Sequence, residues 1–596
     1  MSTRRTGLFL LAGVMIGLVI TGLATWTTLL RSSETPGGFA GEVRLGPLDR
    51  AAVYNRGRLK SFKSFASETV STIAGPRGVR VEVDGELVFA PADFAYLDLM
   101  LRPERYEDAP LIHLGNKPMR QQLGAALLRD GIASEEELRR FVETGQIAEP
   151  LLFTPSAMQL FNQWSSDLIR TRKFVDRLEG AVNLRRPEAL LSLLRVIPPP
   201  NHDPKTPWLN PGELFPVAPG QTPTPGQVLA MERMEPSLRE EIARRWVAFA
   251  QAWRAGDATT ANARLAEFTA RVREVSPELY PSESRMFAES LYFRIGSLVW
   301  GWVIYLAAVL VLLMAVAWRW PGARAMGIGL FSVAFVVQTA ALLLRWYIAG
   351  RWPNSNMFEA VTTSVWFGAL LAIPMEYAAR KTPLKNLFLI GAAVASMAAL
   401  MSAQFIHRLD PSVNNMMPIL HDLWLYIHTN VIIAAYALIA MAAVTAILYL
   451  LWRLFGGGPA HARLGGTEML IEASSAASGR ATTATGRRLA SSKASLGEVF
   501  DGATLVMVEL SFILLWAGII MGAIWADHSW GRPWGWDPKE VFALNTFLVY
   551  LVLIHIRLKT RDKGLWTALL ALIGCGVMLF NWIVINFVIA GLHSYA

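Results

Sequence analysis

Cysteine is almost absent from this chain, because Cys575 is the only one among 596 residues. A single thiol cannot build an intramolecular disulfide framework, a zinc finger, an iron–sulfur site or a CxxC redox pair. The sequence also lacks a CxxCH segment, so the chain is not itself a c-type cytochrome. These classes of protein are excluded before any fold is considered.

Charge is also scarce. Charged residues make up 17% of the chain and hydrophobic residues 53%, whereas an average soluble protein is roughly 25% charged. The 21 tryptophans argue against disorder, which needs few aromatic residues and high charge. The net charge of +9 does not gather on a basic face with interleaved aromatics, so nucleic acid is not a predicted partner.

The apolar residues lie in two parts of the chain. Residues 7–30 form one run behind Arg4 and Arg5, too long for a signal-peptide core and without an A-x-A site, which predicts an uncleaved membrane anchor over residues 1–30. Residues 293–596 contain eight further runs of membrane-spanning length, at 295–317, 326–347, 360–377, 386–405, 430–452, 501–525, 541–558 and 565–590. We therefore expect an α-helical polytopic membrane protein with about nine transmembrane helices.

Lys and Arg gather in alternate loops of this map, which contain Arg319, Arg380 and Lys559 among others. The positive-inside rule places these loops, the N-terminus and the Gly/Ala/Ser/Thr-rich segment 454–498 in the cytoplasm. We expect 454–498 to be a flexible loop. Residues 31–292, the intervening loops and the C-terminus are then expected outside the cytoplasm.

Residues 31–292 have the composition of a soluble α+β domain. Val79–Val83 followed by Gly85 predicts a hairpin, and Ser134 with Glu137 forms the capping box of a helix. We find no catalytic constellation in this segment, so we expect it to dock a partner rather than to react.

Four tryptophans lie within the predicted outer loop 525–540: Trp525, Trp530, Trp534 and Trp536. Asp537, Pro538 and Glu540 at its end are typical of a capped helix start. An aromatic belt at the membrane interface would explain one or two of the tryptophans. Four of them, spaced by Gly and Pro, favour a platform for a flat hydrophobic ligand.

Five of the nine histidines fall on the same predicted outer face: His407, His421, His428, His528 and His593. Neutral imidazole is a common metal and haem ligand. His428 and His593 lie at helix ends at similar depth, as an axial pair would require, whereas the other three could equally be solvated. His555 lies within a predicted span, roughly 4–5 Å from its inner end, where either a functional role or snorkelling is possible.

These motifs resemble the CcsA/ResC type of the cytochrome c assembly, haem-handling family with its tryptophan-rich WWD motif. The resemblance covers about residues 295–596 and lies in the segments 350–359, 424–428, 530–540, 555–558 and 591–595. It implies a bacterial cytoplasmic membrane protein that carries haem outward. With a ResB/CcsB-type partner, such a protein presents haem to the CxxCH motifs of apocytochrome c, as part of a haem lyase (holocytochrome c synthase) complex.

The resemblance also implies residue roles. His428 and His593 would hold the iron of non-covalently bound haem b outside, His555 would belong to an inner site, and the loop with Trp530, Trp534, Trp536 and Asp537 would pack the macrocycle. Arg532 and Lys539 are candidates for the propionates or for lipid headgroups. Arg351 departs from the family, where His is frequent, and removes a possible extra ligand.

Other functions stay open at this stage. A haem exporter or chaperone without ligation activity would carry the same residues. A b-type haem respiratory subunit would need two membrane-embedded histidines per haem, and this sequence offers one in total. A lipid-linked glycosyltransferase would need a true Trp-Trp-Asp tripeptide, which is replaced here by Trp-Gly-Trp-Asp.

Overall fold

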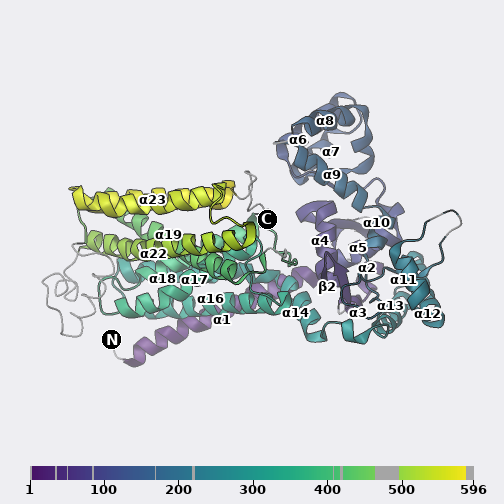
Figure 1. Cartoon of the computed structure of the whole chain (residues 1–596), viewed down its shortest axis with the longest axis horizontal. Coiled ribbons are helices and arrows are strands. Elements are labelled where there is room, and N and C mark those ends of the chain that lie inside the picture. The colour runs from purple at the N-terminus through teal and green to yellow at the C-terminus, as the bar shows by residue number, and fades with distance from the viewer. Residues whose placement is uncertain are drawn as a thin grey trace. The chain divides into compact units, whose positions relative to one another are not determined.

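The structure is a computed structural model of the whole chain (Figure 1). It describes residues 3–33, 37–49, 51–83, 86–167, 170–217, 220, 222–406, 409–416, 420–462 and 495–585. His407, His593 and most of the expected loop 454–498 lie outside these described residues.

The chain divides into two compact units, one of residues 1–26 with 296–596 and one of residues 27–295. In the described part of the first unit and its N-terminal helix, nine helices are long and apolar enough to cross a membrane. They are α1 (Thr3–Ser33), α15 (Trp302–Ala317, preceded by the 3₁₀ turns Gly296–Gly301), α16 (Pro321–Ala349), α17 (Met357–Ala379), α18 (Leu387–Phe405), α19 (Leu423–Leu454), α22 (Leu496–Trp530), α23 (Pro538–Lys559) and α24 (Lys563–Phe580), which continues as a π-helical segment, Asn581–Ile585. The chain is therefore a mostly helical, multi-pass membrane protein.

Several of these helices are longer than the apolar runs that predicted them, because capping residues set their ends. The Asp422 side chain accepts hydrogen bonds from the backbone N–H groups of Trp424 and Leu425, so α19 begins before the apolar run at 430. Ser495 begins α22 with a complete capping box. Gly531, in the left-handed conformation at φ 68°, ends α22.

The four-tryptophan segment differs from the expected loop at 525–540. Residues 525–530 contain no helix breaker and continue α22, so only 531–537 connect it to α23. The predicted cap at the other end is confirmed: Asp537 and Glu540 form a capping box around Pro538. Trp525 and Trp530 are thus helical residues, while Trp534 and Trp536 lie in the connection.

Charged groups tie α22 to α23 near the start of α22. The Arg557 guanidinium on α23 donates to both carboxylate oxygens of Asp501 on α22, at 2.9 and 2.7 Å. Asp501 also accepts from the backbone N–H of Ala462, and the Tyr449 hydroxyl donates to the carbonyl of Ala460 at 2.8 Å. The start of the expected flexible segment 454–498 is therefore held against the helices.

The helices approach closely where their residues are small. α19 and α22 lie side by side (Figure 1), and the hydroxyls of Thr445 and Thr504 meet between them at 2.8 Å. A Cβ on Gly13 of α1 would lie 2.1 Å from the Met326 carbonyl oxygen of α16. The N-terminal helix thus packs into the membrane unit through a glycine face.

In its described residues the second unit is helical, with three two-stranded antiparallel sheets. The strands are β1 (Ala52–Asn55) with β2 (Arg58–Ser61), β3 (Val79–Val83) with β4 (Glu86–Ala90), and β5 (Pro110–His113) with β6 (Gln146–Ala148). The hairpin expected at residues 79–83 and the capping box of Ser134 and Glu137 are both confirmed.

Most helices of the second unit pack on a large apolar core that includes Phe62, Tyr96 and Trp253. Met286 of the last helix belongs to a smaller cluster with Ala52 and Trp208. The helices of this unit are α2 (Phe39–Glu42), α3 (Gly46–Asp49), α4 (Phe62–Ala74), α5 (Ala92–Leu101), α6 (Lys117–Arg129), α7 (Glu135–Thr144), α8 (Pro155–Ser166), α9 (Arg172–Leu184), α10 (Pro187–Leu193), α11 (Pro225–Arg233), α12 (Pro236–Ala255), α13 (Ala258–Arg273) and α14 (Glu283–Arg294).

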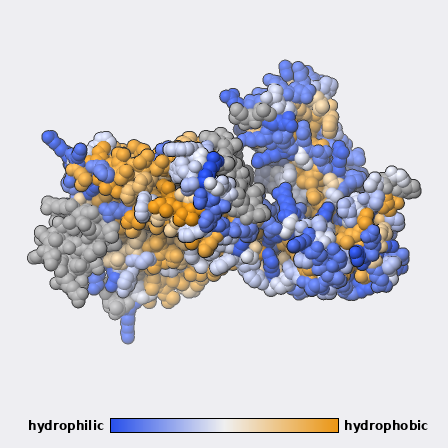
Figure 2. Space-filling model, in the orientation of Figure 1, coloured by the Kyte–Doolittle hydropathy of each residue, from blue (hydrophilic) through white to orange (hydrophobic). Residues whose placement is uncertain are grey.

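The two units differ in the surface they present. In Figure 2 the long helices of the first unit carry broad hydrophobic areas, whereas the second unit is mostly covered by hydrophilic residues. The first of these surfaces suits lipid and the second suits water.

Candidate functional site

The tryptophans around the α22–α23 connection pack as two edge-to-face pairs. The Trp525 and Trp530 ring centroids are 4.8 Å apart, and those of Trp534 and Trp536 are 5.9 Å apart. Trp525 is buried, whereas Trp536 has a φ of 55° and is 71% exposed. Trp536 therefore exposes its indole, and its backbone has a conformation that non-glycine residues rarely adopt.

His428 lies in the second turn of α19 with its ring against α22. Its Nδ1 is 2.7 Å from the Gly518 carbonyl oxygen, which can only accept, so Nδ1 carries the proton and Nε2 carries the lone pair. A Cβ on Gly522 would lie 2.6 Å from His428 Cε1, so α22 needs glycine here. The ring is thus fixed in the tautomer that can ligate a metal through Nε2.

A cavity of about 240 Å³ opens beside His428 among α17, α19, α22, α23 and the π-helical segment. Two predicted aromatic residues, Trp525 and Trp534, line it with His428. Its polar lining includes Lys539 and Glu540 from the first turn of α23. Trp582 lines it from the π-helical segment Asn581–Ile585, a contribution that the sequence analysis missed because nothing in an apolar run marks a cavity wall.

Of the two residues predicted as possible propionate contacts, one lines the cavity and the other does not. Lys539 lines the cavity, while Arg532 is exposed and its guanidinium stands close to Gly535 of the same connection. Asp537 is buried at the helix cap, where its carboxylate accepts from the backbone N–H of Lys539. Asp537 therefore shapes the start of α23.

His421 and His528 lie on the surface near the start of α19. His528 Nδ1 is 3.7 Å from a carboxylate oxygen of Asp422, the residue that caps α19. Among the described residues no group of three or more His, Cys, Asp and Glu could hold a metal ion. Within that part of the chain, His428 is the histidine that lines the cavity.

His555 lies far along α23 from the cavity. The helix separates it from Glu540 by 15 residues, roughly 22 Å at 1.5 Å each. Its side chain is exposed on the surface of the helical unit, and its Nδ1 is 2.8 Å from the Leu551 carbonyl oxygen. Two residues farther along, Arg557 ties α23 to α22 through Asp501.

Behind the cavity lies a buried charge network that the sequence analysis did not identify. Glu359 of α17 pairs with Arg345 of α16 at 2.8 Å and with Arg351 at 2.9 Å, and its side chain is fully buried. The sequence does show ionisable residues at the ends of apolar runs, which are unusual there. Their spacing in the sequence does not tell which of them pair with one another. Arg351, which stands where a further histidine ligand was considered, is thus a partner of Glu359.

This network joins two of the segments that connect the membrane helices. Arg345 donates to the carbonyls of Pro411 and Ser412, at 2.7 and 2.8 Å, and Arg351 donates to that of Asn414 at 2.9 Å. The segment 350–356, which carries Arg351, is thereby joined to 409–416.

The same segment reaches the helix that carries His428. The Trp352 indole N–H donates to the side-chain oxygen of Asn430, and the Asn354 amide donates to Thr429. Thr429 and Asn430 directly follow His428 in α19. The network is therefore coupled to the helix turn that bears the histidine.

The region that contains the cavity matches a known protein family. The cytochrome C assembly protein family matches residues 354–593, which include the cavity, His428 and His555. A cytochrome c biogenesis protein CcsA from Thermosynechococcus vestitus is 33% identical over 315 residues, covering 50% of this chain and 97% of that protein. The chain belongs to the CcsA-type cytochrome c assembly family.

Two further comparisons define the extent of the similarity. A CcsA protein from a Synechococcus species is 30% identical over 317 residues, covering 49% of this chain and 92% of that protein. Protein NrfI from Wolinella succinogenes is 26% identical over 522 residues, covering 85% of this chain but 50% of NrfI. The likeness to NrfI thus extends into the second unit. The resemblance found in the sequence is confirmed, and the chain is a membrane protein of cytochrome c biogenesis.

Proposed function

We propose that this CcsA-type chain carries haem across the cytoplasmic membrane of a bacterium and presents it outside for covalent attachment to apocytochrome c. A ResB/CcsB-type membrane protein is the proposed partner. The observation that carries the proposal is His428, held in its ligating tautomer beside Trp525 and Trp534 in a cavity. Haem b is the cargo, bound without a covalent bond to this chain.

The outer site combines a ligand with an aromatic wall. His428 Nε2 would bind the iron, and His593 is the proposed second ligand. The cavity of about 240 Å³ is smaller than ordinary ligand pockets of ~300–1,000 Å³. We therefore expect the flat macrocycle to lie partly in the cavity and partly against Trp534 and Trp536. Lys539, at the cavity wall, would face a propionate.

Attachment requires each haem vinyl group to meet a cysteine thiol of CxxCH. The thiol S–H adds across the vinyl double bond: a carbon–sulfur bond forms, and the hydrogen goes to the neighbouring carbon. No oxidant is consumed in this addition. The contribution of the chain is to hold the cargo so that both vinyl groups reach the thiols, and proximity and orientation of this kind can lower a barrier by about 7–11 kcal/mol.

The proposed inner site lies at His555. An ionisable side chain on an apolar helix face is costly against lipid. His555 is exposed on such a face, next to the apolar and exposed Val552 and Leu558. This exposure supports a partner helix or haem that covers His555 in the complex. Snorkelling toward the headgroups is the competing explanation.

The proposed orientation places residues 31–292, the tryptophan connection and the C-terminus outside the cytoplasm. It is supported by Lys and Arg in alternate loops of the nine-helix map. Alkaline phosphatase fused near residue 200 should be active, and a cytoplasmic fluorescent reporter fused there should be dark. The opposite pattern would place His428 on the cytoplasmic side and overturn the proposal.

Cytochrome maturation tests the proposed function itself. The full chain, a ResB/CcsB-type partner and a reporter apocytochrome c are produced together in a host whose own maturation genes are deleted. Covalent haem in the reporter is then measured after denaturing electrophoresis. We expect a haem-stained reporter only when chain and partner are both present.

Two other outcomes would contradict this proposal. Equal staining without the chain would make it dispensable. If haem reaches the outer face but the reporter carries no covalent haem, the role of the chain would be export alone. A reporter that lacks both CxxCH cysteines cannot form the covalent bonds, so any staining of it measures non-covalent haem.

A further inference from the structure

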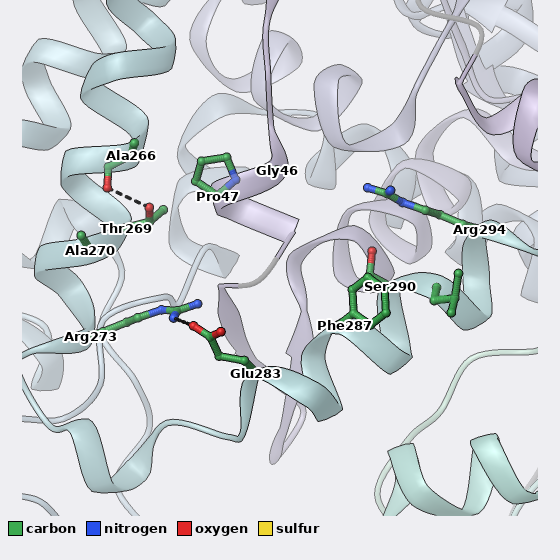
Figure 3. A pocket seen from close by; sticks show the side chains of 11 residues that line it. Gly46, Pro47, Ala266, Thr269, Ala270, Arg273, Glu283, Phe287, Ser290 and Arg294 are labelled. Atoms are coloured by element: carbon green, nitrogen blue, oxygen red, sulfur yellow. Dashed lines mark hydrogen bonds and ion pairs between the residues drawn. The ribbon is translucent and has the colours of Figure 1, made fainter.

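A second hollow, unrelated to the haem cavity, lies in the unit of residues 27–295. Its volume is about 560 Å³, and its walls are α13, α14 and the start of α3 at Pro47. Figure 3 shows Phe287 and Ser290 pointing from α14 into the hollow, with Arg273 bonded to Glu283 on one side and Arg294 on the other. The proposed function uses none of these residues.

One face of α14 forms a wall of this hollow. Glu283, Phe287, Leu291 and Arg294 recur every three or four residues, so they share one helix face. Glu289 lies on another face, where it is fully buried and pairs with Arg58 of β2 at 2.9 Å. This buried pair fixes α14 to the unit, so the hollow has a defined shape.

The lining is cationic and apolar at once. The two guanidinium groups of Arg273 and Arg294 outnumber the one carboxylate, Glu283, which is 2.6 Å from Arg273. Phe287 is 58% exposed in the same wall. Guanidinium groups bind phosphate oxygens in a bidentate manner, and an exposed phenyl ring beside them suits acyl chains.

In the sequence, the hollow is followed directly by a candidate membrane span. Arg294 is two residues before Gly296, where the first candidate span after the second unit begins. Two residues span at most ~7 Å, so Arg294 lies within that distance of the start of this candidate span along the chain. Trp300 and Trp302 follow closely, as in the aromatic belt of a membrane interface.

We propose that this hollow binds the phosphate group of an anionic phospholipid. Arg294 and Arg273 contact the phosphate, while Phe287 and Leu291 contact the first carbons of the acyl chains. The bound lipid holds α14 through its cationic and apolar side chains. This inference does not depend on haem transport.

The test uses the full chain purified in detergent and then placed in nanodiscs. The discs contain phosphatidylcholine alone or phosphatidylcholine with phosphatidylglycerol, and lipid that stays with the protein is counted by native mass spectrometry. We expect retained phosphatidylglycerol in the wild type and about a tenfold weaker retention in Arg294→Gln, as for the loss of one charge-assisted contact. Arg244→Gln, which alters an exposed arginine of α12 outside the lining, should match the wild type.

A second variant separates a lipid from a free phosphate. Phe287→Ser changes an exposed side chain, so folding should persist; it should weaken phosphatidylglycerol retention but leave competition by inorganic phosphate unchanged. Equal retention of phosphatidylglycerol in the wild type and Arg294→Gln would overturn the proposal. Equal retention of phosphatidylcholine, or displacement of lipid by inorganic phosphate alone at low concentration, would overturn it as well.

Discussion

Replacing His428 with alanine should abolish cytochrome c maturation while haem stays bound at the inner site. The imidazole lines the cavity, whereas His555 lies roughly 22 Å along α23 from Glu540 at the cavity wall. His555→Ala should instead reduce haem at the inner site. Both variants are measured by the haem absorption of the purified complex and by haem staining of the reporter cytochrome.

Matched controls come from the same face of the protein. His421 and His528 are exposed near the start of α19, so their alanine variants should mature cytochrome normally. Gly522→Val should behave like His428→Ala, because a Cβ at this position overlaps the histidine ring. Exogenous imidazole should restore His428→Ala but not Gly522→Val, whose added side chain stays in place. Equal loss of all haem in His428→Ala and His555→Ala would argue against two sites.

Replacing Glu359 with alanine should destabilise the protein and distort the outer site together. Removal of the carboxylate leaves the buried Arg345 and Arg351 without their counter-charge, and breaking a buried pair costs about 3–5 kcal/mol of the free energy of unfolding. The two arginines that donate to the carbonyls of 409–416 would lose the carboxylate that positions them. We expect a lower thermal midpoint and an altered spectrum of the outer haem.

A second buried pair supplies the control for this prediction. Glu376 pairs with Arg324 at 2.9 Å at the other end of α17. Glu376→Ala should also lower the thermal midpoint, but it should leave the outer haem spectrum unchanged. The same spectral change in both variants would mean that general destabilisation, and not the position of Glu359, disturbs the site.

The sequence predicts the elements of this fold better than their contacts. The cap at Asp537 was predicted because a capping box is local, whereas the end of α22 was placed too early because residues 525–530 are polar and aromatic yet still helical. The expected span at 430–452 put His428 at the edge of a helix. The cap at Asp422 places His428 within α19 instead.

The contacts that could not be predicted join residues that are far apart in the sequence. Glu359, Arg345 and Arg351 were visible in the sequence, but hydropathy does not tell which helix ends meet. Trp582 lines the cavity from a π-helical segment more than 150 residues beyond His428. The hollow at Phe287 is built from Pro47 and from residues of α13 and α14, which no local pattern brings together.

The absorption spectrum of the full chain purified with its ResB/CcsB-type partner tests the central claim most directly. Purified from haem-replete membranes, the wild-type complex should show a Soret band and the reduced spectrum of b-type haem with two histidine ligands. The His428→Ala complex should keep part of the Soret band and lose the bis-histidine signature of the outer haem. A wild-type complex without a Soret band would contradict the account.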